Sequence, residues 1–121
     1  MGRIVHFEIP VEDTKKAKEF YSDVFGWNFA AFGDDSYLLA TTGPDNQPGI
    51  NGAIMKKRAA AQPVTNSIDV SNIDESMKKV EEKGGFILVP KTALPGVGYM
   101  AYFKDLDGNI MGLWQQDASA R

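Results

Sequence analysis

The stretch HFEIPVEDTKKAKEFYSDVFGW, residues 6–27, carries the strongest signal of architecture because a similar pattern recurs later in the chain. A shift of 59 residues places it over TNSIDVSNIDESMKKVEEKGGF, residues 65–86, without a gap. Past a loop of different length the shift becomes 60, so that Gly52 falls on Gly112. Each half has about 60 residues, which is marginal for a stable domain, so two modules sharing one core are expected.

Each half predicts a strand, a helix and three further strands. Residues 3–9 alternate and are rich in β-branched and aromatic types, as strands are. Asp13 then caps an apolar stripe at helical spacing, and Gly26 ends that helix. Asn72, with Glu75 three residues later, begins the second helix in the manner of a capping box. The remaining predicted strands are residues 27–32, 36–41, 52–56, 64–70, 86–89, 99–104 and 109–115.

The sequence thus predicts an α+β fold made of two tandem βαβββ modules in a single domain, residues 1–121. The modules cover about residues 1–56 and 64–116, and residues 57–63 form a linker. Because each helix covers only one face of its sheet, the other faces must bury their side chains elsewhere. We therefore expect the two sheets to enclose an open groove.

Composition excludes several classes of protein. The chain has no cysteine, which rules out disulfides and thiolate chemistry, and its single histidine is His6. A net charge of −3 makes nucleic acid and anionic membranes poor partners. No apolar run approaches the ~18 residues needed to span a bilayer, and no signal peptide is apparent. A cytoplasmic location is expected.

The opening motif and the closing motif YFKDLDGNIMGLW, residues 102–114, resemble the vicinal oxygen chelate superfamily. Its members include glyoxalase I, bleomycin-resistance proteins and extradiol dioxygenases, which share paired βαβββ modules. The DxDGN turn before the last strand is especially typical. The resemblance covers nearly the whole chain and implies the grooved fold, whereas function does not follow from a fold that hosts unrelated chemistries.

The resemblance also implies four metal-ligand positions, on the first and fourth strands of each module. Here they read His6, Gly52, Thr65 and Gly112, of which only His6 is a good ligand. Glu8 shares the face of His6 and could assist it. Gln115 has the opposite parity to Gly112 and is expected to point away from the groove. We therefore expect no metal and no other cofactor.

Strand alternation places the candidate groove residues. His6 and Glu8 lie on one face of the first strand, while Val5, Phe7 and Ile9 face the helix. The repeat extends the polar face to the second module, so the predicted ligand-binding set is His6, Glu8, Gly52, Thr65, Ser67, Gly112 and Trp114. In this set the two glycines form the floor and Trp114 stacks on a planar ligand.

Each assignment has an alternative. His6 and Glu8 are the weak candidates for catalysis, as an acid/base pair, or else hydrogen-bonded wall residues. The glycines either widen the groove or mark a bulge or close approach. Residues 94–98 form either a flap or a plain connector.

Three functions fit these residues. The first is a metal-free binding protein for a small molecule of unknown identity. The second is a metal-dependent lyase, isomerase or dioxygenase with an atypical site. The third is an accessory or structural homodimer whose groove is filled by its own side chains. The missing ligands disfavour the second, the paired glycines favour the first over the third, and whether the chain is an enzyme is left open. A homodimer is expected in any case, because the uncovered sheet faces would be exposed in a monomer.

Overall fold

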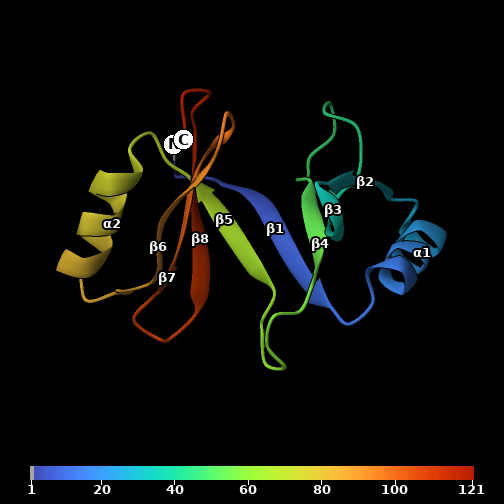
Figure 1. The fold of residues 1–121 in the computed structure, drawn as a ribbon, viewed down its shortest axis with the longest axis horizontal. Helices are drawn as coiled ribbons and strands as arrows, with labels where there is room; N and C mark the ends of the chain where they lie inside the picture. The colour runs from blue at the N-terminus through green and yellow to red at the C-terminus, as the bar shows by residue number, and fades with distance from the viewer. Residues whose placement is uncertain (1) are drawn as a thin grey trace. The chain divides into compact units, whose positions relative to one another are not determined.

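In the computed structural model, which describes residues 2–121, β1 (Ile4–Val11) leads into α1 (Thr14–Phe25) as the first half of a βαβββ module (Figure 1). The fold is α+β, and a second βαβββ module follows the first. The chain divides into two units. One is Val5–Thr65, and the other is Asn66–Arg121 together with the segment that ends at Ile4. We call them the N-terminal and C-terminal units.

The sheet of the N-terminal unit has the strand order β2-β3-β4-β1. Its other strands are β2 (Asn28–Phe32), β3 (Asp34–Thr41) and β4 (Gly52–Lys56). β1 runs parallel to β4, while β3 is antiparallel to both β2 and β4. The β2–β3 hairpin turns at Gly33, whose φ of 85° lies in the left-handed region that glycine tolerates.

Both ends of α1 are built as the sequence predicts. The Asp13 carboxylate accepts a hydrogen bond from the Lys16 amide, and Gly26 closes the helix with a φ of 74°. The Tyr21 ring stacks on Trp27 at 4.8 Å between centroids, and Phe7 lies 5.6 Å from Trp27. Phe7 therefore faces the helix side of the sheet, as the alternation in β1 predicts.

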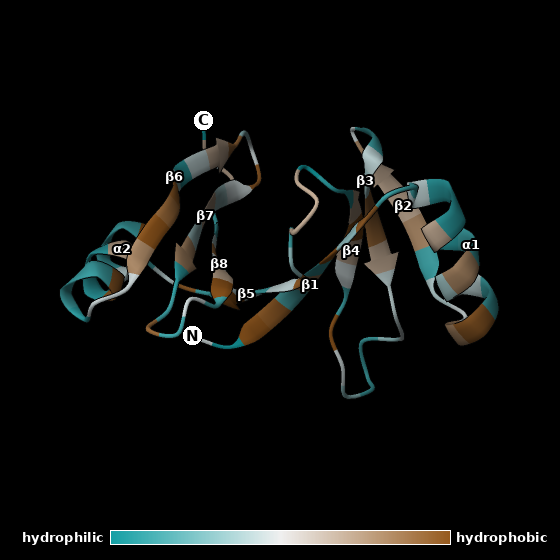
Figure 2. Cartoon of the chain, turned by 90° about the horizontal axis from the view of Figure 1, so that it is seen from below, coloured by the Kyte–Doolittle hydropathy of each residue, from teal (hydrophilic) through white to brown (hydrophobic). Residues whose placement is uncertain are grey.

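The rest of the apolar stripe of α1 is open to solvent. Within α1, all of whose residues the structure describes, none is fully buried. Phe20, Val24 and Phe25 are 57%, 56% and 61% exposed. Figure 2 shows the apolar residues of this helix in brown. The stripe that periodicity identified is thus only partly used for packing within the N-terminal unit.

The sheet of the C-terminal unit has the strand order β5-β8-β7-β6. The strands are β5 (Thr65–Asp69), which begins at the boundary between the units, β6 (Phe86–Leu94), β7 (Gly98–Lys104) and β8 (Ile110–Gln116). Its core contains Ile73, Ala101 and Leu113, which are almost fully buried. Gly2 and Arg3 also belong to this unit, because the Gly2 amide donates to the Asp69 carbonyl and the Asp69 amide donates to the Arg3 carbonyl.

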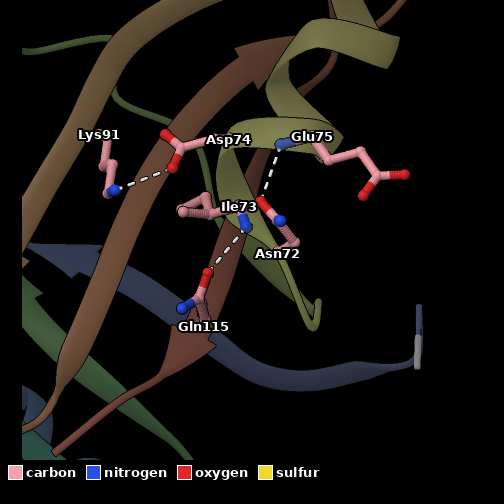
Figure 3. A network of polar contacts seen from close by, with 6 residues as sticks. All are labelled: Asn72, Ile73, Asp74, Glu75, Lys91 and Gln115. Carbon is pink, nitrogen blue, oxygen red and sulfur yellow. Dashed lines mark hydrogen bonds and ion pairs between the residues drawn. The ribbon is translucent and has the colours of Figure 1, made fainter. Parts of the chain in front are cut away.

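The start of α2 (Ile73–Glu82) is held by two side chains (Figure 3). The Asn72 side chain accepts from the Glu75 amide at 3.0 Å, as predicted for an N-cap. The Gln115 side-chain oxygen accepts from the Ile73 amide at 2.8 Å. Gln115 therefore points toward the helix side of its sheet, as its parity predicts. The Glu75 carboxylate pairs with Lys79 at 3.4 Å, so of the expected capping box it is the Asn72 arm that the structure shows.

β6 is longer than the sequence predicts. The predicted strand ends at Val89, just before Pro90. The strand instead continues to Leu94, with register shifts on both sides of Val89. Proline is tolerated here because β6 lies at the edge of its sheet and pairs only with β7.

The longer β6 makes the expected loop at residues 94–98 a tight turn. The Val97 amide donates to the Leu94 carbonyl, and the Gly96 amide donates to the Ala120 carbonyl. These bonds tie the turn to the C-terminal segment, which favours the connector interpretation over the flap interpretation.

Candidate functional site

Four polar side chains form a hydrogen-bonded cluster in the N-terminal unit. The Tyr37 hydroxyl donates to Glu8 Oε2 at 2.6 Å and lies 2.9 Å from His6 Nε2. The Thr65 hydroxyl donates to Glu8 Oε1 at 3.4 Å. Glu8 is only 8% exposed and Thr65 only 7%. We call His6, Glu8, Tyr37 and Thr65 the polar cluster.

Strand register explains why these residues meet. His6 and Glu8 alternate with Phe7 on β1, so they lie on the sheet face opposite α1. Glu8 is opposite Ala53 in the parallel β1–β4 pair, and Tyr37 is opposite Met55 in the β3–β4 pair. The long tyrosine side chain reaches across β4 to the two residues of β1. A buried carboxylate is tolerated here because both of its oxygens accept hydrogen bonds.

The directions of the hydrogen bonds in the cluster favour one tautomer of His6. Since the Tyr37 hydroxyl proton is directed at the carboxylate, the tyrosine oxygen can only accept from the imidazole. The Nε2 atom of neutral His6 must then carry the proton, which leaves Nδ1 as the acceptor nitrogen. A ligand with a hydroxyl or N–H group could donate to that nitrogen. Proton gain at Nδ1 would be stabilised through Tyr37 by the Glu8 charge.

Burial lowers the pKa of His6 below its ordinary value of 6.5, and the nearby Glu8 charge offsets part of that effect. His6 is therefore neutral at physiological pH, in the state that accepts a proton. This suits either hydrogen bonding to a ligand or general-base chemistry.

A divalent metal does not fit these residues. Among residues 2–121, no group of three or more His, Asp or Glu side chains is placed to hold one. His6 Nε2 and Glu8 Oε2 both bind the Tyr37 hydroxyl, so the acceptor nitrogen Nδ1 of His6 is the main metal-ligating atom that the cluster offers, which falls short of a three-ligand site. Glycine at position 112 offers no donor, and Thr65 is directed at Glu8. No chemical step through a metal is derived for this chain.

The remaining predicted groove residues lie mostly in the C-terminal unit. Ser67 pairs with Gly112, and Asp69 pairs with Trp114, so Ser67, Gly112 and Trp114 share one sheet face. A Cβ at Gly112 would come within 2.6 Å of the Ser67 hydroxyl. The Trp114 ring covers Gly98, where a Cβ would lie 2.7 Å from it. The close-approach interpretation of Gly112 therefore accounts for the absence of a side chain there.

Gly52 does not share the face of His6 and Glu8, contrary to the predicted set. It pairs with Phe7, and a Cβ at this position would collide with the Phe7 ring and carbonyl. The true counterpart of Gly112 is Ala53, because Ser67 pairs with Gly112 as Glu8 pairs with Ala53. The shift of 59 thus persists into the fourth strands, and the assumed change to 60 moved Gly52 to the wrong face.

Tyr37 was not among the site residues predicted from the sequence, so its role in the cluster was missed. The one available signal was chemical, because a partly buried tyrosine hydroxyl requires a polar partner. His6 and Glu8 were the obvious partners on a strand of the same module. Which strand neighbours which was not deducible from the pattern.

Among the described residues 2–121, neither helix is long and apolar enough to cross a membrane.

A family model described as "Bleomycin resistance protein-like N-terminal" matches residues 3–43. A "Glyoxylase-like domain-containing protein" of Didymella fabae is 30% identical over 114 residues, which cover 89% of each chain. "Putative glyoxylase CFP32" of Mycobacterium bovis is 27% identical over 117 residues, 89% of this chain. The chain spans only 43% of the length of that relative.

Solved structures share the fold at lower identity. A glyoxalase/bleomycin resistance protein/dioxygenase superfamily member from Vibrio splendidus has a TM-score of 0.69 at 18% identity, covering 97% of this chain and 100% of that one. Methylmalonyl-CoA epimerase from Mycobacterium tuberculosis has a TM-score of 0.66 at 17% identity, covering 96% and 88%. At these identities the likeness concerns architecture alone.

Proposed function

This chain belongs to the glyoxalase/bleomycin-resistance/dioxygenase superfamily, and on that basis we propose that it binds a small molecule without a resident metal. The observation that carries the proposal is the polar cluster, which presents an acceptor nitrogen of His6 on the sheet face that α1 leaves uncovered. A cytoplasmic location is part of this proposal.

The ligand interacts with the cluster through a hydrogen-bond donor. His6 Nδ1 accepts from the ligand, while Tyr37 and Glu8 hold the imidazole in the required tautomer. Ser67, Gly112 and Trp114 share a sheet face of the C-terminal unit and stay sequence predictions as ligand-binding residues. Gly52 lies on the other face of its own sheet, beside Phe7.

A ligand screen with a matched pair of variants tests this function. Small molecules are screened by thermal shift, where a ligand at 100 Kd stabilises the protein by about 2.7 kcal/mol. Hits should lose affinity by about tenfold or more in His6→Ala, since that factor corresponds to ~1.4 kcal/mol for one hydrogen bond. Lys78→Ala on the exposed face of α2 is the control and should leave affinity unchanged. Hits that bind His6→Ala as tightly as wild type would refute the proposed site.

Elemental analysis tests the metal-free part of the proposal. The purified protein should contain no stoichiometric transition metal. About one zinc, nickel, iron or manganese ion per chain that disappears in His6→Ala would instead establish the metal-dependent alternative.

The homodimer remains a prediction as well. The exposed Phe20, Val24 and Phe25 of α1 support it, since clustered apolar side chains at a surface commonly mark an interface. Sedimentation at micromolar concentration should give twice the 13.3 kDa chain mass. A 13.3 kDa species would contradict it.

A further inference from the structure

A small cavity lies in the N-terminal unit, beside the end of β4 and the beginning of β3. Its volume is about 230 Å³, and its wall consists of Ser36, Tyr37, Met55, Lys56, Lys57 and Arg58. Pockets for drug-sized ligands measure ~300–1,000 Å³, so this cavity has room for one end of a small ligand only. Tyr37 belongs both to this wall and to the polar cluster.

The hydroxyl groups of the wall already donate hydrogen bonds. The Tyr37 hydroxyl donates to Glu8, and the Ser36 hydroxyl donates to Asp34. The wall therefore offers a ligand mainly the side-chain N–H groups of Lys56, Lys57 and Arg58. Such donors select an acceptor-rich, negatively charged group.

These three consecutive cations form a locally positive segment in a chain whose net charge is −3. Lys57 is partly neutralised, because its Nζ lies 3.4 Å from a Glu12 carboxylate oxygen. Lys56 and Arg58 are exposed and belong to the wall of the cavity. Asp34 lies two residues before Ser36 of the wall, and its carboxylate accepts hydrogen bonds from the Ser36 amide and hydroxyl.

We infer that this cavity is an anion subsite, which takes the carboxylate or phosphate end of a small organic acid. The inference rests on the proposed function, because the other end of the same ligand would donate to His6 across Tyr37. The ligand class is then a small hydroxy or amino acid, or a phosphate ester with a free hydroxyl. The fork of Arg58 matches the paired oxygens of either anion.

Inorganic phosphate and acetate are the probes that test the subsite. Each is titrated at constant ionic strength, and binding is followed by NMR shifts of the Lys57 and Arg58 amides. We expect saturable shifts, and a Kd that rises by about tenfold or more in the double variant Lys56→Ser with Arg58→Ser. The control double variant is Lys78→Ser with Lys83→Ser, which removes the same charge from exposed positions outside the cavity. The melting temperatures of both variants verify that they remain folded.

Two outcomes overturn the inference. One is the absence of saturable shifts with either anion, and the other is an equal loss of affinity in the control variant, which would indicate general electrostatic attraction. The two proposals fail separately. If ligands depend on His6 but neither anion binds, the subsite fails and the proposed function stands. If the anions bind the cavity while no ligand depends on His6, the proposed function fails.

Discussion

The two modules carry different chemistry at equivalent positions of the same backbone. On the sheet face opposite the helix, the first module places Glu8 beside Ala53, and the second places Ser67 beside Gly112. Glu8 requires donors from Tyr37 and Thr65 to offset its burial. Ser67 instead fills the space that a side chain at Gly112 would take. Both modules therefore pair their first strand with their fourth, β1 with β4 and β5 with β8. On this sheet face the buried carboxylate and its hydrogen-bond donors belong to the first module's cluster.

The largest expected effect separates the two glycines that the sequence treats as equivalent. Gly52→Ala should destabilise the protein by about 3 kcal/mol, the upper end for overpacking, because the new Cβ meets the Phe7 backbone as well as its ring. Denaturant unfolding measures the loss. Gly43→Ala is the control, since its Cβ would lie 3.7 Å from the nearest atom, and it should change stability by less than about 1 kcal/mol. Similar losses of stability for both variants would show that Phe7 of β1 leaves room for a side chain at position 52 of β4.

The next effect tests the polar cluster. Tyr37→Phe should cost ~1–3 kcal/mol, because the buried Glu8 carboxylate loses a donor while the ring is kept. Tyr99→Phe in the second module keeps the ring on which Lys91 lies at 4.4 Å, so it should change stability by less than about 0.5 kcal/mol. If both substitutions lowered the stability equally, the hydroxyl of Tyr37 would have no special role in holding the buried Glu8 carboxylate of the first module.

Gly112→Ala should cost about 1–2 kcal/mol, less than Gly52→Ala, since the Ser67 hydroxyl can rotate whereas a backbone carbonyl cannot. Much of that cost should disappear in a Ser67→Ala background, where the contact that remains is the 3.3 Å one to the Ser67 Cβ. A double-mutant cycle measures this coupling. Strictly additive effects would mean that Ser67 is not what keeps position 112 free of a side chain.

The smallest effect concerns pH. The pKa of His6 is lowered in the folded state, so the unfolded chain binds more protons just below pH 6.5. The stability that neutral His6 contributes is present above 6.5 and is lost as pH falls toward the folded pKa. Melting temperatures between pH 7.5 and pH 5 should fall more for wild type than for His6→Asn. A steeper fall in His6→Asn would reverse the sign and contradict the burial argument.

The sequence predicted the βαβββ repeat, both N-caps and the face of β1 because these depend on local residue patterns. The sequence alone predicts the N-caps Asp13 and Asn72 and the alternation of His6, Phe7 and Glu8, without knowledge of which strands pair. The face on which Gly52 lies could not be predicted in this way, because the alignment of the two halves can place the insertion in the preceding loop one residue earlier or later. One residue changes the face of a strand, and that single step produced the wrong floor for the site.

The backbone hydrogen bonds that join Asp69 to Gly2 and Arg3 have a consequence for how the chain can be divided. A fragment that begins at Asn66 contains the helix and four strands of the second module but lacks the backbone that satisfies Asp69. Its β5 would present an unpaired edge, which is a template for joining another chain. The second half of the chain, cut at Asn66, is therefore not self-sufficient: residues 2–3, from the far end of the sequence, complete the edge of its sheet.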